Sequence, residues 1–412
     1  MKIKSIKNIY QNLGPGMLFA AQSVGTSHLV QSTRAGGEYG FSLVLLVMLA
    51  CIIKYPAFRF GIDYANATKT SLLEHYLTQG KLVIGLFTLS LLVDMFIAIA
   101  AVTLVSAGLL SAVLNLDVNA QYIGVLLLFT FGIILVLGGY KTLENITKLF
   151  VLIFVCLVLV ATAMTILKLF SITTNLLPAV EFNNTTLFFM IAVAGWMPTS
   201  VSASVYLSEW RAKKIQLVNE ETTNYSSIDF DIGYWGTAFL AFCFVLLGAV
   251  LIYPTGVSTE QSAIGFAKLL FSMFTNTVGE WAFPVIALAA IAVMISTCLT
   301  LMDACPRAAM RMINKFKPIK NCYSILVFIQ IAGASIILLF FVSSFTSLID
   351  LATGLAFISA PIIAFLNHRA VFHSGIKEEY QPRPYLKIWS IVGIIALSIF
   401  SIVFIYVRFL SN

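Results

Sequence analysis

Two short segments of this sequence combine helix-breaking residues with hydroxyl groups inside otherwise apolar runs. The first is Gly25-Thr26-Ser27-His28, preceded by Gln22; the second is Met197-Pro198-Thr199-Ser200, preceded by Ala194. Proline cannot donate to the helix ladder and glycine lowers helix stability, so we expect both runs to unwind near their middle. Small and hydroxyl residues in membrane helices also permit close packing. Their clustering at matched positions of two apolar runs instead favours a transporter's substrate site, because unpaired backbone is tolerated in a bilayer only around a protein-walled cavity.

A carboxylate lies in the middle of another apolar run. Asp94 follows Leu91-Leu92-Val93, and an acid at the centre of a membrane helix costs about 2.5–3.5 kcal/mol on insertion scales. Such a residue marks a relay or an ion site, or is a paired packing residue. His28 is either a helix-to-helix hydrogen-bond partner or a second group that carries a coupling proton, because imidazole titrates near neutral pH. The sequence therefore predicts proton coupling through Asp94 and His28.

These residues must be positioned by membrane-spanning helices. Of the 412 residues, 59% are hydrophobic and only 10% are charged, which excludes an ordinary soluble domain. A bilayer crossing needs about 20 apolar residues. Eleven runs satisfy this, and they lie at 14–34, 41–60, 82–113, 120–139, 146–168, 185–208, 233–253, 281–304, 322–343, 346–367 and 387–408.

The basic residues predict how these spans are oriented. Lysine and arginine collect in alternate loops, whereas Leu114–Ala120 and Ser171–Thr186 carry none. Cytoplasmic loops are the basic ones, so Met1 is expected inside and Asn412 outside a cell membrane, the inner membrane of a bacterium. The net charge of +7 then reports topology, and nucleic acid is not an expected partner.

The interrupted runs are the first and the sixth, which predicts an inverted repeat. We expect an all-α polytopic protein with one transmembrane domain over residues 1–412. Residues 14–168 would form the first five-helix repeat, 185–367 the second, and 387–408 an eleventh helix. No H-E-x-x-H or G-x-S-x-G motif occurs, so we expect no enzyme activity and no cofactor.

Several motifs, in this order, resemble the NRAMP family of proton-coupled divalent-metal transporters, which has a LeuT-type fold. They are Gly14-Pro15-Gly16, Arg34-Ala35-Gly36-Gly37-Glu38-Tyr39-Gly40, Gly139-Tyr140-Lys141-Thr142-Leu143-Glu144 and Trp196-Met197-Pro198. The resemblance implies a LeuT-type 5+5 repeat, symport of a metal ion with protons, and an acidic residue of the proton route at Asp94. It also implies a thioether metal ligand at Met197 and carbonyl ligands at Gln22 and Ala194.

The metal-binding quartet of that family, Asp-Pro-Gly-Asn, is replaced here. Gly25 stands in place of the carboxylate ligand, His28 in place of the amide, and Thr199 in place of the histidine after the proline. His28 and Met197 would suit a soft or borderline metal ion. The alternative is a small anion or carboxylate-bearing solute, such as bicarbonate or an amino acid. Hydroxyls of Thr26, Ser27, Thr199 and Ser200 and the positive ends of two half-helices would bind it. Both cargoes stay open at this point.

Overall fold

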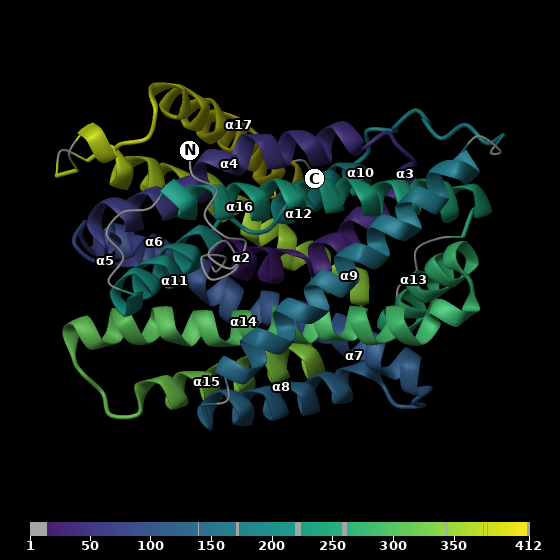
Figure 1. The fold of residues 1–412 in the computed structure, drawn as a ribbon, viewed down its shortest axis with the longest axis horizontal. Helices are drawn as coiled ribbons and strands as arrows, with labels where there is room; N and C mark the ends of the chain where they lie inside the picture. Colours follow the sequence, from purple (N-terminus) through teal and green to yellow (C-terminus); the bar gives the residue numbers. More distant parts are fainter. Residues whose placement is uncertain are drawn as a thin grey trace, which may run out of the picture.

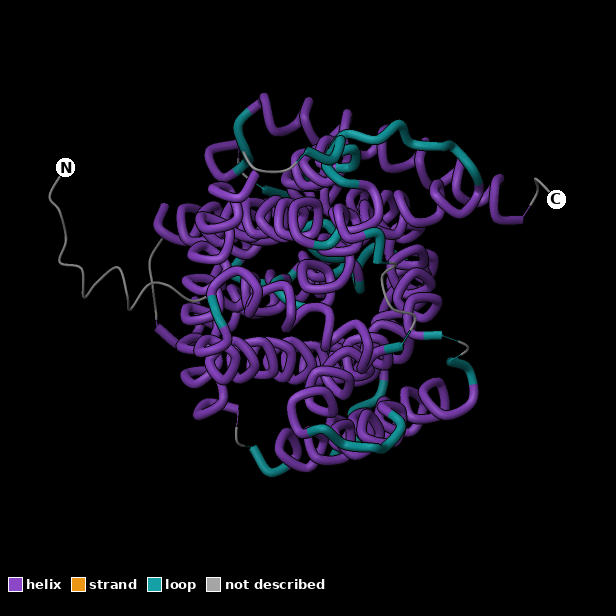
Figure 2. The backbone as a smooth tube through the Cα atoms, turned by 90° about the vertical axis from the view of Figure 1, so that its right-hand side faces the viewer, coloured by secondary structure: helices purple, strands orange, loops and turns teal. Residues whose placement is uncertain are grey.

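The computed structural model describes residues 15–138, 140–169, 173–218, 224–257, 262–342, 344–373, 375–376 and 378–409. All regular secondary structure in these ranges is helical (Figure 2). The predicted all-α fold is therefore confirmed. Met1 and Asn412, whose sides of the membrane the sequence predicts, lie outside the described residues.

The first half of the chain contains two helices that change their winding. The first predicted span consists of three pieces, and the third contains a wide π-helical segment between two α-helices. The elements are α2 (Pro15–Ser23), η1 (Ser27–Ser32), α3 (Thr33–Tyr39), α4 (Val44–Thr68), α5 (Leu72–Tyr76), α6 (Lys81–Leu92), η2 (Val93–Ala98), α7 (Ile99–Leu114), α8 (Ala120–Val136) and α9 (Tyr140–Leu169).

The second half begins with another interrupted pair, α10 and α11. The elements are α10 (Asn184–Trp196), α11 (Ala203–Val218), α12 (Asn224–Leu251), η3 (Tyr253–Thr255), α13 (Ala263–Val278), η4 (Glu280–Ala282), α14 (Phe283–Phe316), α15 (Cys322–Phe340), α16 (Phe345–Val371), η5 (Glu378–Tyr380) and α17 (Pro384–Phe409). Two of these helices, α5 and α13, were not predicted. Figure 1 shows α13 at one end of the long helix α14.

Eight helices of the described residues are long and apolar enough to cross a membrane. Three further apolar helices are shorter, namely α8, α10 and α13. Large apolar side chains on α8, α9, α15 and α17 point outward, as Leu126, Leu167, Phe328 and Ile388 illustrate. An exposed apolar surface this extensive suits lipid rather than water, so the multi-pass membrane protein predicted from composition is confirmed.

The interrupted helices lie at the centre of the bundle, where glycines allow backbones to touch. A Cβ on Gly36 of α3 would lie 2.1 Å from the Val245 carbonyl oxygen of α12, and one on Gly195 of α10 would lie 2.3 Å from the Thr353 carbonyl oxygen of α16. Small residues at such crossings are typical of membrane helix packing. The close contacts fix both broken helices against continuous neighbours.

Candidate substrate site

The two predicted helix breaks are both present, and they touch. The first helix is unwound at Val24 and Gly25, and the sixth between Met197 and Ser202. The Ser27 hydroxyl lies 3.3 Å from the Pro198 carbonyl oxygen and donates to it in one of its orientations. Residues beside both breaks therefore line a common space.

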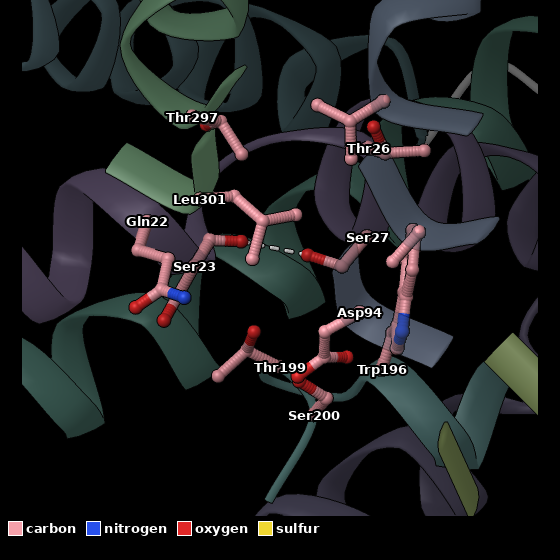
Figure 3. A pocket seen from close by; sticks show the side chains of 12 residues that line it. Gln22, Ser23, Thr26, Ser27, Asp94, Trp196, Thr199, Ser200, Thr297 and Leu301 are labelled. Carbon is pink, nitrogen blue, oxygen red and sulfur yellow. Dashed lines mark hydrogen bonds between the residues drawn. The ribbon is translucent and has the colours of Figure 1, made fainter. Parts of the chain in front are cut away.

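That space is a cavity of about 40 Å³ (Figure 3). It is lined by Gln22, Ser23, Thr26, Ser27, Asp94, Ala98, Val102, Trp196, Thr199, Ser200, Thr297 and Leu301. A water molecule needs about 10–15 Å³ on the same measure. In this conformation the cavity therefore has room for a solute of only a few heavy atoms, and its wall combines Ser and Thr side chains with apolar ones.

Several oxygens on this wall lack a partner. Gln22 Oε1, Ser23 Oγ and Thr26 Oγ1 are buried and have no hydrogen bond to any described residue. Buried polar atoms are nearly always hydrogen-bonded. These three oxygens therefore have hydrogen-bonding capacity that the described residues do not use.

Asp94 is the one ionisable side chain among the residues that line the cavity. It lies on η2, and its Oδ2 accepts hydrogen bonds from Ser202 Oγ at 2.5 Å and Tyr206 Oη at 3.1 Å. Both donors belong to the second broken helix or its turn, so η2 and α11 are joined through this carboxylate. The sequence predicted Asp94 but gave no sign of Ser202 and Tyr206.

His28 and Met197 do not line the cavity. His28 is fully buried; its Nε2 lies 2.8 Å from the Thr237 carbonyl oxygen of α12, and its Nδ1 lies 2.8 Å from Ser27 Oγ. A carbonyl can only accept, so Nε2 carries a proton, and Nδ1 is engaged by the serine. The Met197 sulfur is also buried and accepts a hydrogen bond from Ser32. In this conformation both side chains are bound to neighbouring residues and neither faces the cavity.

The Ala194 carbonyl, another expected ligand, is bound by a lysine that sequence reasoning missed. Lys54 of α4 is fully buried, and its Nζ donates to the carbonyl oxygens of Ala194 at 2.6 Å, Gly195 at 2.7 Å and Thr199 at 3.4 Å. A lysine within an apolar span is itself a functional signal. It was overlooked because the run around it is otherwise typical of a membrane helix.

The comparisons with known proteins agree with this geometry. The profile described as "Natural resistance-associated macrophage protein-like" matches residues 16–407. This chain belongs to the Nramp family. An uncharacterised protein of Pasteurella multocida is 32% identical to this Nramp protein over 404 residues, which are 95% of this chain and 91% of that protein. Members of the family are membrane transporters rather than enzymes.

Solved structures show the LeuT-type fold of this Nramp protein. The manganese transporter of Eremococcus coleocola, as a glutamate-to-glutamine variant, has a TM-score of 0.76 at 12% identity, covering 100% of this chain and 91% of that one. MhsT in complex with L-phenylalanine has a TM-score of 0.67 at 14% identity, covering 96% of this chain and 98% of that one. The predicted family and LeuT-type fold are thus confirmed.

Ion pairs join α3 of this Nramp protein to α16. Arg34 of α3 donates from Nη1 to Asp350 Oδ1 of α16 at 2.9 Å and from Nε to Glu38 Oε1 at 3.3 Å. Its guanidinium also lies 4.6 Å from the ring centroid of Phe189 on α10. Gln31 completes the cluster by donating to Asp350 at 3.0 Å. Asp350, Arg34 and Glu38 therefore form one ion-paired cluster and are not among the residues that line the cavity.

A second cluster lies on the α11 side. Arg311 of α14 is 3.4 Å from Glu209 of α11 and 3.4 Å from Glu74 of α5. Burial is the main cause that raises the pKa of Glu209 to about 7, and Arg311 acts in the opposite direction. Each charged cluster thus joins a broken helix to a continuous one, α3 to α16 and α11 to α14.

Proposed function

We propose that this Nramp protein is a secondary active transporter that carries a small anion, inorganic or carboxylate-bearing, by alternating access. The supporting observation is that both helix breaks meet around one buried, hydroxyl-lined cavity. Breaks at corresponding positions of two repeats are where LeuT-type carriers bind substrate. We place the protein in a cell membrane with its N-terminus inside, as the loop charges predict.

The two charged clusters support alternating access. The Arg34 cluster would close the outer side and the Arg311 cluster the inner side, and opening either one separates a half-helix from its neighbours. Transport then requires that the clusters open in turn. Rigid-body movement of one repeat against the other is the usual way this occurs in such folds.

Donor groups favour an anion as the cargo. The hydroxyls of Thr26, Ser27, Thr199 and Ser200 line the cavity, and η1 and α11 begin at the breaks with the positive ends of their helix dipoles. A volume of about 40 Å³ suits an ion of the size of bicarbonate or formate better than an amino acid. Because Asp94 would repel an anion when ionised, we propose that a cotransported proton neutralises it.

Lys54 counts against a metal ion at Ala194. Two unit charges 4 Å apart interact by about 4 kcal/mol at an effective dielectric constant of 20, so a divalent ion beside the ammonium would be repelled by about 8 kcal/mol. Asp94 could offset part of this repulsion. It is the one carboxylate on the cavity wall, and it is already bound by Ser202 and Tyr206.

A divalent metal ion is the second candidate, because the Nramp family transports metal ions and a manganese transporter shares the fold. Its ligands would have to be Asp94 and oxygens such as those of Gln22 and Thr26. Such a set suits Mg²⁺ or Mn²⁺ rather than the softer ions expected for His28 and Met197.

Flux measurements with purified protein in proteoliposomes separate these candidates. We expect uptake of bicarbonate or formate driven by an inward proton gradient, and no Mn²⁺ uptake. Thr26→Val should raise the KM for the anion about tenfold, because a buried donor is lost. The matched control Thr130→Val removes an exposed hydroxyl on α8 and should change nothing. Mn²⁺ uptake without anion uptake would refute the anion proposal and support the second candidate.

A further inference from the structure

Lys54 has an unusual environment for a lysine inside a membrane protein. Its side chain is fully buried in α4, and among the described residues its ammonium has no carboxylate partner. All three of its hydrogen bonds go to backbone carbonyls, those of Ala194, Gly195 and Thr199. A buried charge without a counter-ion is costly and in membrane proteins marks a functional position.

The three carbonyls lie on both sides of one helix break. Ala194 and Gly195 belong to the last turn of α10, whose terminal carbonyls have no partner within the helix and carry the negative end of its dipole. Thr199 follows Pro198 and is one of the residues that line the cavity. The ammonium therefore bridges the break, directly behind the cavity wall.

Terminal carbonyls at an unwound helix are the groups that coordinate a cation in broken-helix carriers. Here a side chain already supplies that cation. A transported metal ion at the same carbonyls would have to displace the ammonium, which is tethered by α4 and donates its described hydrogen bonds to these three carbonyls.

We propose that Lys54 is a resident cation that occupies the cation position of the α10 break and thereby selects an anionic cargo. This inference rests on the proposed function and names the residue that determines whether the cargo is negatively or positively charged. The positive charge behind Thr199 attracts an anion into the cavity, where the hydroxyl groups complete its coordination. A lysine that only capped α10 would hold the helix end but would leave the choice of cargo unchanged.

The test compares Lys54→Met, Lys54→Arg and the control Lys168→Met in proteoliposomes. Lys168 is a suitable control because its ammonium also donates to a carbonyl, that of Asn276, on the exposed surface. Formate and Mn²⁺ are the probes. We expect Lys54→Met to lose at least tenfold in formate uptake and to gain Mn²⁺ binding, measured as a thermal shift. Lys54→Arg should retain formate uptake within a few fold, and Lys168→Met should match the wild type.

The outcomes distinguish the two proposals. If Lys54→Met takes up formate as well as Lys168→Met does, the inference about Lys54 is wrong while anion transport stands. If the wild type takes up Mn²⁺ and no anion, the proposed function is wrong and the inference falls with it. If Lys54→Met does not fold, the test is made on the wild-type protein by a thermal-shift measurement with millimolar Mn²⁺. We expect no shift of the melting midpoint, and a saturable shift would overturn the role of Lys54.

Discussion

Replacing Asp350 with asparagine should open the α3 side of the cavity. Asp350 Oδ1 accepts hydrogen bonds from Arg34 at 2.9 Å and from Gln31 at 3.0 Å. Asparagine keeps the size of the side chain and one acceptor oxygen but removes the negative charge. Arg34 would keep only its weaker contact with Glu38, at 3.3 Å, as an ion pair.

The expected size of the effect follows from exposure. A hydrogen bond to a charged group contributes about 1.5–3 kcal/mol. The Arg34 side chain is 7% exposed, but that of Asp350 is 29% exposed, so water screens part of the interaction. We take the lower end, about 1.5 kcal/mol, which corresponds to about a tenfold rise in the ratio of open to closed molecules.

Thiol labelling measures this ratio. Thr199→Cys places a thiol on the cavity wall, and a membrane-impermeant reagent is added on the side predicted to face outward. The chain without this substitution gives the background, since five of the six native cysteines are buried. Asp350→Asn should raise the labelling rate about tenfold, whereas Asp117→Asn, in an exposed loop, should not.

A labelling rate within twofold of the parent would refute the role of this ion pair. The double variant Arg34→Gln with Asp350→Asn provides a further check. If the two side chains act on each other, the second substitution should add little to the first. Fully additive effects would show that each residue acts through other contacts.

Three further predictions concern stability and packing. Gly195→Ala should abolish transport, because its Cβ would lie 2.3 Å from the Thr353 carbonyl oxygen and overpacking costs about 1–3 kcal/mol; normal flux would contradict this. Stability should fall as pH rises from 4.5 towards 7, because the folded state binds more protons at Glu209, whose pKa burial raises to about 7. Glu209→Gln should flatten that slope in thermal melts of the detergent-solubilised protein. Asn367→Leu leaves the buried Tyr76 hydroxyl unpaired and should lower the melting midpoint by roughly 1–3 °C, measured the same way.

The sequence predicts the two helix breaks well because their causes are local. Gly25 and Pro198 weaken a helix wherever they occur in it, and the neighbouring hydroxyls add a second signal. The cavity-lining positions of Gln22, Thr26, Ser27, Thr199 and Ser200 follow from those breaks, since side chains beside an unwound turn face the space it opens. Their binding of a cargo stays a prediction.

Side-chain direction beyond a break could not be predicted. His28 directly follows the cavity residues in the sequence, yet it points to Thr237 of α12. The α-helical period no longer applies there, because η1 is wound with wider turns. Lys54 was missed for a different reason: its partners are backbone carbonyls 140 and more residues away, which have no signature in side-chain sequence.

The helix α13 was missed because its composition is mixed. Residues 263–278 form a helix with one apolar and one more polar face, and they contain no run of about 20 apolar residues. A scan for membrane spans cannot detect an amphipathic helix that packs on one face only. Here that face packs against α7 and α9, which the bundle places together only after folding.

The π-helical winding of Ser27–Ser32 sets the rotation of α3, the helix that directly follows it. A π-helical turn contains roughly one residue more than an α-helical turn, and one residue corresponds to about 100° of rotation around the axis. If this stretch were α-helical, α3 would be turned by about that angle, and Arg34 would face away from Asp350. The wide turns thus absorb one surplus residue, so Arg34 of α3 faces Asp350 although the stretch is one residue too long for an α-helix.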